Sequence, residues 1–112
     1  MGIVILNKQN EFRLFGRVKN VDFDYKRKGD TETIPVLELE LEVPYNGAPD
    51  IVKVTAFYDK AERAAEEVEA GDWIIARGRI KSSKGQYKDK ITFNTDFWAS
   101  YIEKVQTAEI PE

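Results

Sequence analysis

The chain contains no cysteine and no histidine among its 112 residues. The absence of cysteine excludes a disulfide framework, and the absence of both residue types excludes the usual zinc, haem, iron–sulfur and thiol-nucleophile sites. The sequence also lacks a glycine-rich phosphate loop, a serine nucleophile elbow and the acidic spacing of magnesium sites. We therefore expect a protein that is not an enzyme and that needs no metal or cofactor.

Long hydrophobic runs are absent as well, so no membrane-spanning segment is predicted. Residues 1–9 lack the basic leader and long apolar core of a secretory signal, and a cytoplasmic protein is expected. Hydrophobic residues make up 42% of the chain and charged residues 33%, which is typical of one folded domain. We expect this domain to cover residues 1–105 and to be followed by a short, acidic, flexible tail at residues 106–112.

The net charge of −3 argues against a nucleic-acid partner, but the charges are segregated along the chain. Acidic residues concentrate at positions 62–72, at positions 38–42 and near the end. Basic residues fall on predicted strands and hairpins, where they could follow a phosphate backbone, and they include Lys26, Arg27, Lys28, Lys53, Arg77, Arg79, Lys81, Lys84, Lys88 and Lys90. For these residues a solvated surface or salt bridges remain the alternative.

Apolar and polar residues alternate over several segments, which is the pattern of half-buried strands. This pattern predicts strands at 11–25, 36–43, 51–57, 73–81 and 87–105, with a polar loop at 26–33, a turn at 44–50 and a hairpin tip at 82–86. Gly16 lies inside the first predicted strand and indicates a bulge or a sharp bend there.

One helix is predicted between the third and fourth strands. Asp59 is the expected N-cap, the helix begins near Lys60, and Gly71 ends it. Small apolar residues at helical spacing, Ala61, Ala64, Ala65 and Val68, are expected to face a barrel. This order predicts a mainly β protein, a five-stranded OB-fold Greek-key barrel with one helix between strands 3 and 4. OB barrels commonly bind single strands.

Four segments then resemble the OB domain of bacterial and phage single-stranded DNA-binding proteins. They lie at residues 10–18, 54–57, 60–64 and 71–80. The last is the most specific, because it begins with Gly-Asp and continues with an apolar pair, a second glycine and a further apolar residue. The resemblance implies non-sequence-specific binding of single-stranded DNA that protects it in replication, recombination or repair. It also implies a homo-dimer or homo-tetramer in which the first strands of two subunits pair.

The family stacks aromatic rings on bases and places lysines and arginines along the phosphates. The resemblance assigns such contacts to Phe57, Lys53 and Lys81, and places Tyr25 where the family often has a binding tyrosine. With the aromatic and basic residues of the predicted hairpins, the full expected interface comprises Phe57, Lys53, Tyr58, Tyr25, Lys26, Arg27, Arg79, Lys81, Lys84, Tyr87 and Lys88. Because neighbouring strand residues point to opposite faces, only one of Phe57 and Tyr58 is expected to stack.

The chain also departs from the family. Ile51 stands where a tryptophan is common, residues 81–86 contain no tryptophan, and Asp24 replaces a basic residue. The family's acidic recruitment tip is absent, and residues 108–112 are only faintly similar to it. The alternative is therefore an OB-fold protein-interaction domain, such as a primosome or recombination accessory protein with weak nucleic-acid binding.

Other residues are expected to pack inside the protein or between copies of it. A homo-oligomer interface is predicted at Arg13, Phe15 and Arg77, because an edge strand with a bulky apolar residue invites pairing. Core or subunit contact is favoured over base stacking for Phe12, Trp73, Phe93, Phe97 and Trp98.

Overall fold

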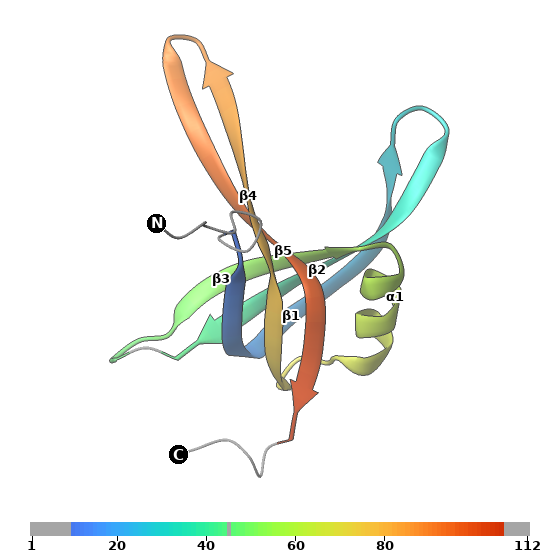
Figure 1. Cartoon of the computed structure of the whole chain (residues 1–112), viewed down its shortest axis with the longest axis vertical. Helices are drawn as coiled ribbons and strands as arrows, with labels where there is room; N and C mark the ends of the chain where they lie inside the picture. The colour runs from blue at the N-terminus through green and yellow to red at the C-terminus, as the bar shows by residue number, and fades with distance from the viewer. Residues whose placement is uncertain (1–9, 45, 107–112) are drawn as a thin grey trace, which may run out of the picture.

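The computed structural model describes residues 10–44 and 46–106, apart from the side chain of Tyr87. It contains five strands and one helix: β1 (Phe12–Lys28), β2 (Glu32–Val43), β3 (Asp50–Phe57), α1 (Tyr58–Glu67), β4 (Trp73–Tyr87) and β5 (Lys90–Val105). The strands close into a barrel in the order β1-β2-β3-β5-β4 (Figure 1). The predicted five-stranded OB barrel with its single helix is confirmed. The expectations for residues 1–9 and for the tail at 107–112 lie outside the described residues.

Strand β1 is long enough to belong to two parts of the barrel. Its first half pairs with β4 over Phe12–Arg17, and its second half pairs with β2 from Arg17 to Lys28. The irregularity lies between Val18 and Asn20 rather than at Gly16. Gly16 instead allows the backbones of β1 and β2 to lie close together, because a Cβ at this position would lie 2.8 Å from the carbonyl oxygen of Glu42.

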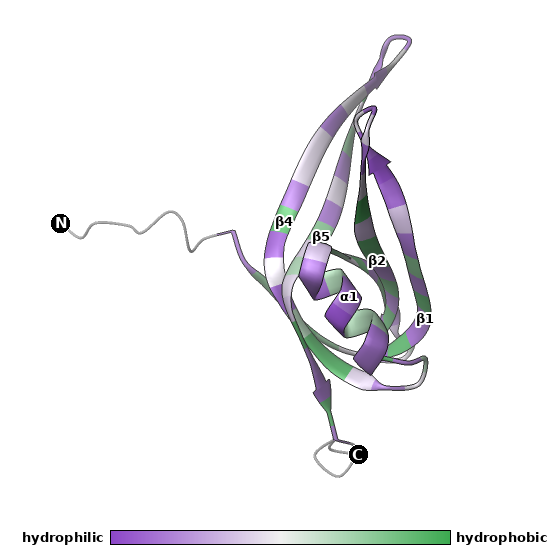
Figure 2. Cartoon of the chain, turned by 90° about the vertical axis from the view of Figure 1, so that its right-hand side faces the viewer, coloured by the Kyte–Doolittle hydropathy of each residue, from purple (hydrophilic) through white to green (hydrophobic). Residues whose placement is uncertain are grey.

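The alternation of β2 becomes the centre of the core. Leu37, Leu39 and Leu41 are fully buried and pack with Val54 and Ile74 from β3 and β4. Figure 2 shows the corresponding change between hydrophobic and hydrophilic residues along the strands. Burial of these branched side chains supplies most of the driving force for closing the barrel.

Helix α1 covers one end of the barrel and buries Ala61 and Ala64, as its spacing predicts. The prediction that Asp59 is the N-cap is wrong: the cap residue is Phe57, which makes no side-chain capping bond, and Asp59 lies in the first turn. A carboxylate in that turn still favours the helix because it complements the helix dipole. The helix ends at Glu67, and Gly71, with φ of 97°, instead forms the turn into β4 by donating its N–H to the carbonyl of Val18 at 2.7 Å.

Two long hairpins rise from the same end of the barrel (Figures 1 and 2). The β1–β2 hairpin turns only after Lys28, and the β4–β5 hairpin turns at Lys88 and Asp89. The predicted polar loop at 26–33 contains the β1–β2 turn but is too long, because residues 26–28 pair with residues 32–34. The predicted hairpin tip at 82–86 is too early. Residues 82–86 pair one to one with residues 91–95, and the two-residue turn takes its positive φ at Lys88.

Candidate nucleic-acid interface

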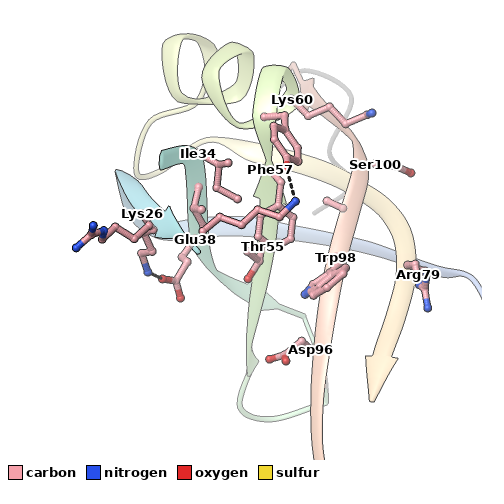
Figure 3. A pocket seen from close by; sticks show the side chains of 15 residues that line it. Lys26, Ile34, Glu38, Thr55, Phe57, Lys60, Arg79, Asp96, Trp98 and Ser100 are labelled. Carbon is pink, nitrogen blue, oxygen red and sulfur yellow. Dashed lines mark hydrogen bonds and ion pairs between the residues drawn. The ribbon is translucent and has the colours of Figure 1, made fainter. Parts of the chain in front are cut away.

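A groove of about 770 Å³ opens between the β1–β2 hairpin and the neighbouring parts of β3, β4 and β5 (Figure 3). Its cationic lining residues come from several elements, and two carboxylates and three aromatic rings lie beside them. The lining comprises Lys26, Arg27, Lys28, Ile34, Val36, Glu38, Thr55, Phe57, Tyr58, Lys60, Arg79, Asp96, Trp98, Ala99 and Ser100. We call the space lined by these residues the groove. Its lining combines flat apolar surfaces with positive charge on long side chains.

The centre of the groove is an aromatic pair from two strands that are distant in sequence. The ring of Phe57, at the end of β3, meets that of Trp98 edge to face, with centroids 5.0 Å apart and planes at 75°. The ammonium of Lys81 lies 5.7 Å from the centre of the Trp98 ring. Both rings are partly exposed, so their free faces are available to a flat ligand.

Trp98 corrects the expectation that it belongs to the core. Its neighbour Phe97 does pack inward, against Phe12 at a centroid distance of 5.2 Å, so Trp98 points the other way. The parallel pairing of β3 with β5 then sets Trp98 beside Thr55 and close to Phe57. Phe97 and Trp98 are neighbours on one strand, so the sequence indicated that they face opposite sides. It did not show which side carries the groove, because that depends on the β3–β5 pairing.

Tyr58 lies in the groove together with Phe57, although the two were expected to face opposite ways. The chain leaves the strand at this point, and Tyr58 takes a positive φ of 61°. The turned side chain meets the β1–β2 hairpin, where the ammonium of Lys28 donates to its hydroxyl at 2.9 Å and lies 5.6 Å from its ring centre. The expectation that the two rings face opposite sides is therefore wrong, and both line the groove.

A carboxylate from β2 holds two of the expected phosphate-binding lysines. Oε1 of Glu38 accepts a hydrogen bond from Lys26 at 2.6 Å, and Oε2 lies 2.8 Å from the ammonium of Lys53. These bonds, from Lys26 first and then Lys53, hold the pKa of Glu38 below its usual value, and they raise the pKa of both lysines. Lys53 thus reaches the groove through Glu38 and does not line it directly.

Other cations of the groove have no such partner. Arg79 and Lys60 form no ion pair with any residue in the described part of the chain, and Arg27 donates to the backbone carbonyl of Asp30 at 2.7 Å. Lys60 was not predicted for the interface. Its place two residues after Tyr58, in the first turn of α1, was the signal that could have identified it.

Some of the expected interface residues lie away from the groove. Tyr25, 55% exposed, donates its hydroxyl to Glu62 of α1 at 3.3 Å, and the negative charge of Glu62 raises the tyrosine's pKa. Lys84 and Lys88 lie farther out on the β4–β5 hairpin, and the side chain of Tyr87 is outside the description. The geometry joins Phe57, Tyr58, Lys26, Arg27 and Arg79 directly, with Lys53 and Lys81 at the margin.

The residues of the predicted oligomer interface do not line the groove. Among residues 10–44 and 46–106, β1 pairs only with β4 between Phe12 and Gly16, so no strand of these ranges pairs with its other edge. Arg13 lies opposite Arg77 in the β1–β4 pair. Phe15 is half-buried rather than exposed, because it stacks on Trp73 at a centroid distance of 5.2 Å. The guanidinium of Arg77 lies 3.4 Å from the carboxylate of Glu11.

Phe93 is 71% exposed on the β4–β5 hairpin, so the expectation of a core position is wrong for it. A contact with another subunit remains a prediction for this residue. Trp73 is partly buried in its stack with Phe15, and Phe12 is in the core as expected.

Neither a metal centre nor a membrane-spanning helix is found in the described residues. No group of three or more acidic side chains in 10–44 and 46–106 is arranged to hold a metal ion. The one helix in these ranges is too short and too polar to cross a bilayer.

Known structures share the barrel of this chain. No family model matches the sequence, and no curated protein matches it. The wild-type single-stranded DNA-binding protein from Thermus aquaticus matches with a TM-score of 0.70 at 21% identity, over 98% of this chain and 47% of its own. A deletion mutant of that protein gives 0.68 at 24%, over 92% and 44%. The domain of the same kind from Synechococcus sp. gives 0.63 at 19%, over 84% and 93%.

The predicted resemblance to the OB fold of single-stranded DNA-binding domains is confirmed by these structures. This chain spans less than half the length of the two Thermus aquaticus proteins, and most of the Synechococcus domain. At these identities the likeness extends to the fold alone.

Proposed function

We propose that this protein binds single-stranded DNA in the groove, with little preference for sequence, and performs no catalysis. The observation that carries the proposal is the meeting of three aromatic side chains and five cations in one open groove, on an OB fold shared with single-stranded DNA-binding domains. Aromatic stacking accepts any base, since every base has a flat π-face, and cations follow the phosphates without reading sequence.

Each part of the groove has a role in this proposal. Phe57, Tyr58 and Trp98 stack on bases, and Arg79 and Lys60 contact phosphates because no carboxylate in the described chain holds them. A duplex keeps its bases stacked on one another and cannot offer their faces, so it should bind weakly. The basic residues of the β4–β5 hairpin, Lys84 and Lys88, would extend the path of the strand.

The wider biological role is part of the proposal. The protein would cover exposed single strands in the cytoplasm of a bacterium or in a phage-infected cell, during replication, recombination or repair. It would act as a homo-dimer or homo-tetramer through the open edge of β1, which carries Arg13 and Phe15, with Arg77 opposite Arg13 on the neighbouring β4. Two or four grooves on one particle would raise the avidity for a long strand.

The test is a fluorescence-anisotropy titration of a labelled oligo-dT at low and at physiological salt, with a duplex of equal length as the control. A matched pair of variants locates the site: Tyr58→Ala changes the groove, whereas Tyr25→Ala removes a similarly exposed tyrosine outside it. We expect salt-sensitive binding to the single strand, weakened by Tyr58→Ala and unchanged by Tyr25→Ala. Absence of binding at low salt, or equal losses in both variants, would refute the proposed site.

A second candidate is a protein-interaction domain with weak nucleic-acid binding. It is favoured by the two carboxylates within the groove, Glu38 and Asp96, which repel phosphates. No binding of oligo-dT even at low salt would support this candidate, because the groove would then serve another ligand.

A further inference from the structure

Glu38 occupies an unusual position for an acidic residue in a groove proposed to bind a polyanion. It projects from β2 toward the groove between Lys26 and Thr55 (Figure 3), and its side chain is only 22% exposed. Its two oxygens are divided between lysines from two different strands, Lys26 of β1 and Lys53 of β3. One carboxylate thereby links three adjacent strands at the side of the groove.

The two lysines cannot serve Glu38 and a phosphate equally well. Both ion pairs are short, at 2.6 Å and 2.8 Å, and both lysine side chains are about half exposed, so phosphates could reach them. A phosphate that contacts either lysine must compete with the carboxylate or sit close to it, and the like charges repel. Each pair joins a half-exposed lysine to a largely buried carboxylate, so a phosphate contact with either lysine comes at the cost of the pair.

We infer that Glu38 limits the affinity of the groove for single-stranded DNA by holding Lys26 and Lys53 away from the phosphates. This inference rests on the proposed function. Glu38 is a positioning residue rather than a contact for the strand. A lower affinity shortens the lifetime of the complex and lets the strand pass to another protein, since differences of affinity between related complexes lie mostly in the dissociation rate.

The chain offers a matched control for the charge itself. Glu40 lies two residues along β2 on the same face, is also partly buried, and forms no ion pair with any residue of the described ranges. Glu38→Gln and Glu40→Gln remove the same charge, but only the first releases the two lysines. The carboxamide has nearly the volume of the carboxylate it replaces, so the packing around either position is preserved.

The experiment measures oligo-dT binding of wild type, Glu38→Gln and Glu40→Gln from low to physiological salt, with thermal melts of all three. For Glu38→Gln we expect binding roughly 3- to 10-fold tighter at low salt. We also expect a log–log salt slope steeper by about 0.7, the value for one additional phosphate contact on a single strand. Stopped-flow dissociation should be slower to a similar degree, and Glu40→Gln should change affinity by less than about twofold.

The outcomes separate the inference from the proposed function. If wild type binds oligo-dT but Glu38→Gln binds equally or more weakly with an unchanged slope, Glu38 supports the lysines and the inference is overturned. If Glu40→Gln tightens binding as much as Glu38→Gln, net charge explains the effect and the inference is again overturned. If neither wild type nor variants bind at low salt, the proposed function fails.

Discussion

Substitution of Trp98 by alanine tests whether the aromatic pair of the groove binds bases. Stacking of one base on an aromatic side chain contributes about 1–3 kcal/mol, so its loss should weaken oligo-dT binding by roughly 5- to 150-fold. The upper part of this range is expected, because Trp98 also supports the ring of Phe57 at 5.0 Å and positions Lys81 over its own face. The alanine variant would thus disturb two platforms and one cation.

The same change has a cost in stability that must be measured separately. Trp98 is half-buried and lies beside the buried Ala99, so Trp98→Ala removes packing as well as a platform. A fully buried tryptophan costs about 3–5 kcal/mol on truncation, and a half-exposed one should cost less. Thermal melts followed by circular dichroism should therefore show a folded variant with a lower midpoint.

Trp98→Phe is the matched control, because it keeps a flat ring on the same strand. We expect Trp98→Phe to recover most of the affinity that Trp98→Ala loses, in an anisotropy titration at fixed salt. If a folded Trp98→Ala protein binds oligo-dT within about twofold of wild type, no base stacks on this ring and the reasoning is refuted.

Three further predictions concern the salt dependence, the bulge in the β4–β5 pairing between Arg77 and Gly78, and the open edge of β1. Arg79→Gln should lower the log–log salt slope of oligo-dT binding by about 0.7, since it removes one phosphate contact, and an unchanged slope would place Arg79 off the path of the strand. Gly78→Ala should destabilise the fold by at least about 1–3 kcal/mol in a denaturant titration, because the new Cβ would overlap the carbonyl oxygen of Trp98; a stability equal to wild type would contradict the backbone geometry at this bulge. Phe15→Lys should shift the protein toward the monomer in sedimentation velocity, and an unaffected oligomer would move the interface away from this edge.

The local elements of the fold were predictable because they follow from short-range patterns. Alternating leucines in β2 fixed which face is buried, and the alanine spacing of α1 fixed its packing side. The ends of the elements were less predictable. The serines, lysine and glycine at 82–86 are typical of a turn, but these residues lie within β4. The β4–β5 hairpin accepts polar residues on both faces there, because both faces are exposed to solvent.

The candidate site was predictable only where it rests on one strand. The resemblance assigned Phe57 and Lys53 to the interface, and the alternation of β3 put them on one face. The described geometry brings Phe57 into the groove and leaves Lys53 at its margin. Trp98 could not be assigned, because its place depends on a parallel contact of two residue pairs between β3 and β5, which are far apart in the chain. Tyr58 was included in the expected interface but was expected to face away from Phe57. The two rings share the groove because strand alternation stops applying where the strand becomes a helix.

The net charge of the whole chain is a poor guide to the charge of the groove for a related reason. The excess of acid resides partly on the exposed side of α1, whereas five cations and two carboxylates line the groove. At physiological salt the field of a surface charge decays within about 8 Å, so a strand in the groove responds mainly to the charges that line it. Glu38 is one of those lining charges and the helix acids on the outer face contribute less, which is why one carboxylate can matter more for binding than the net charge of the whole chain.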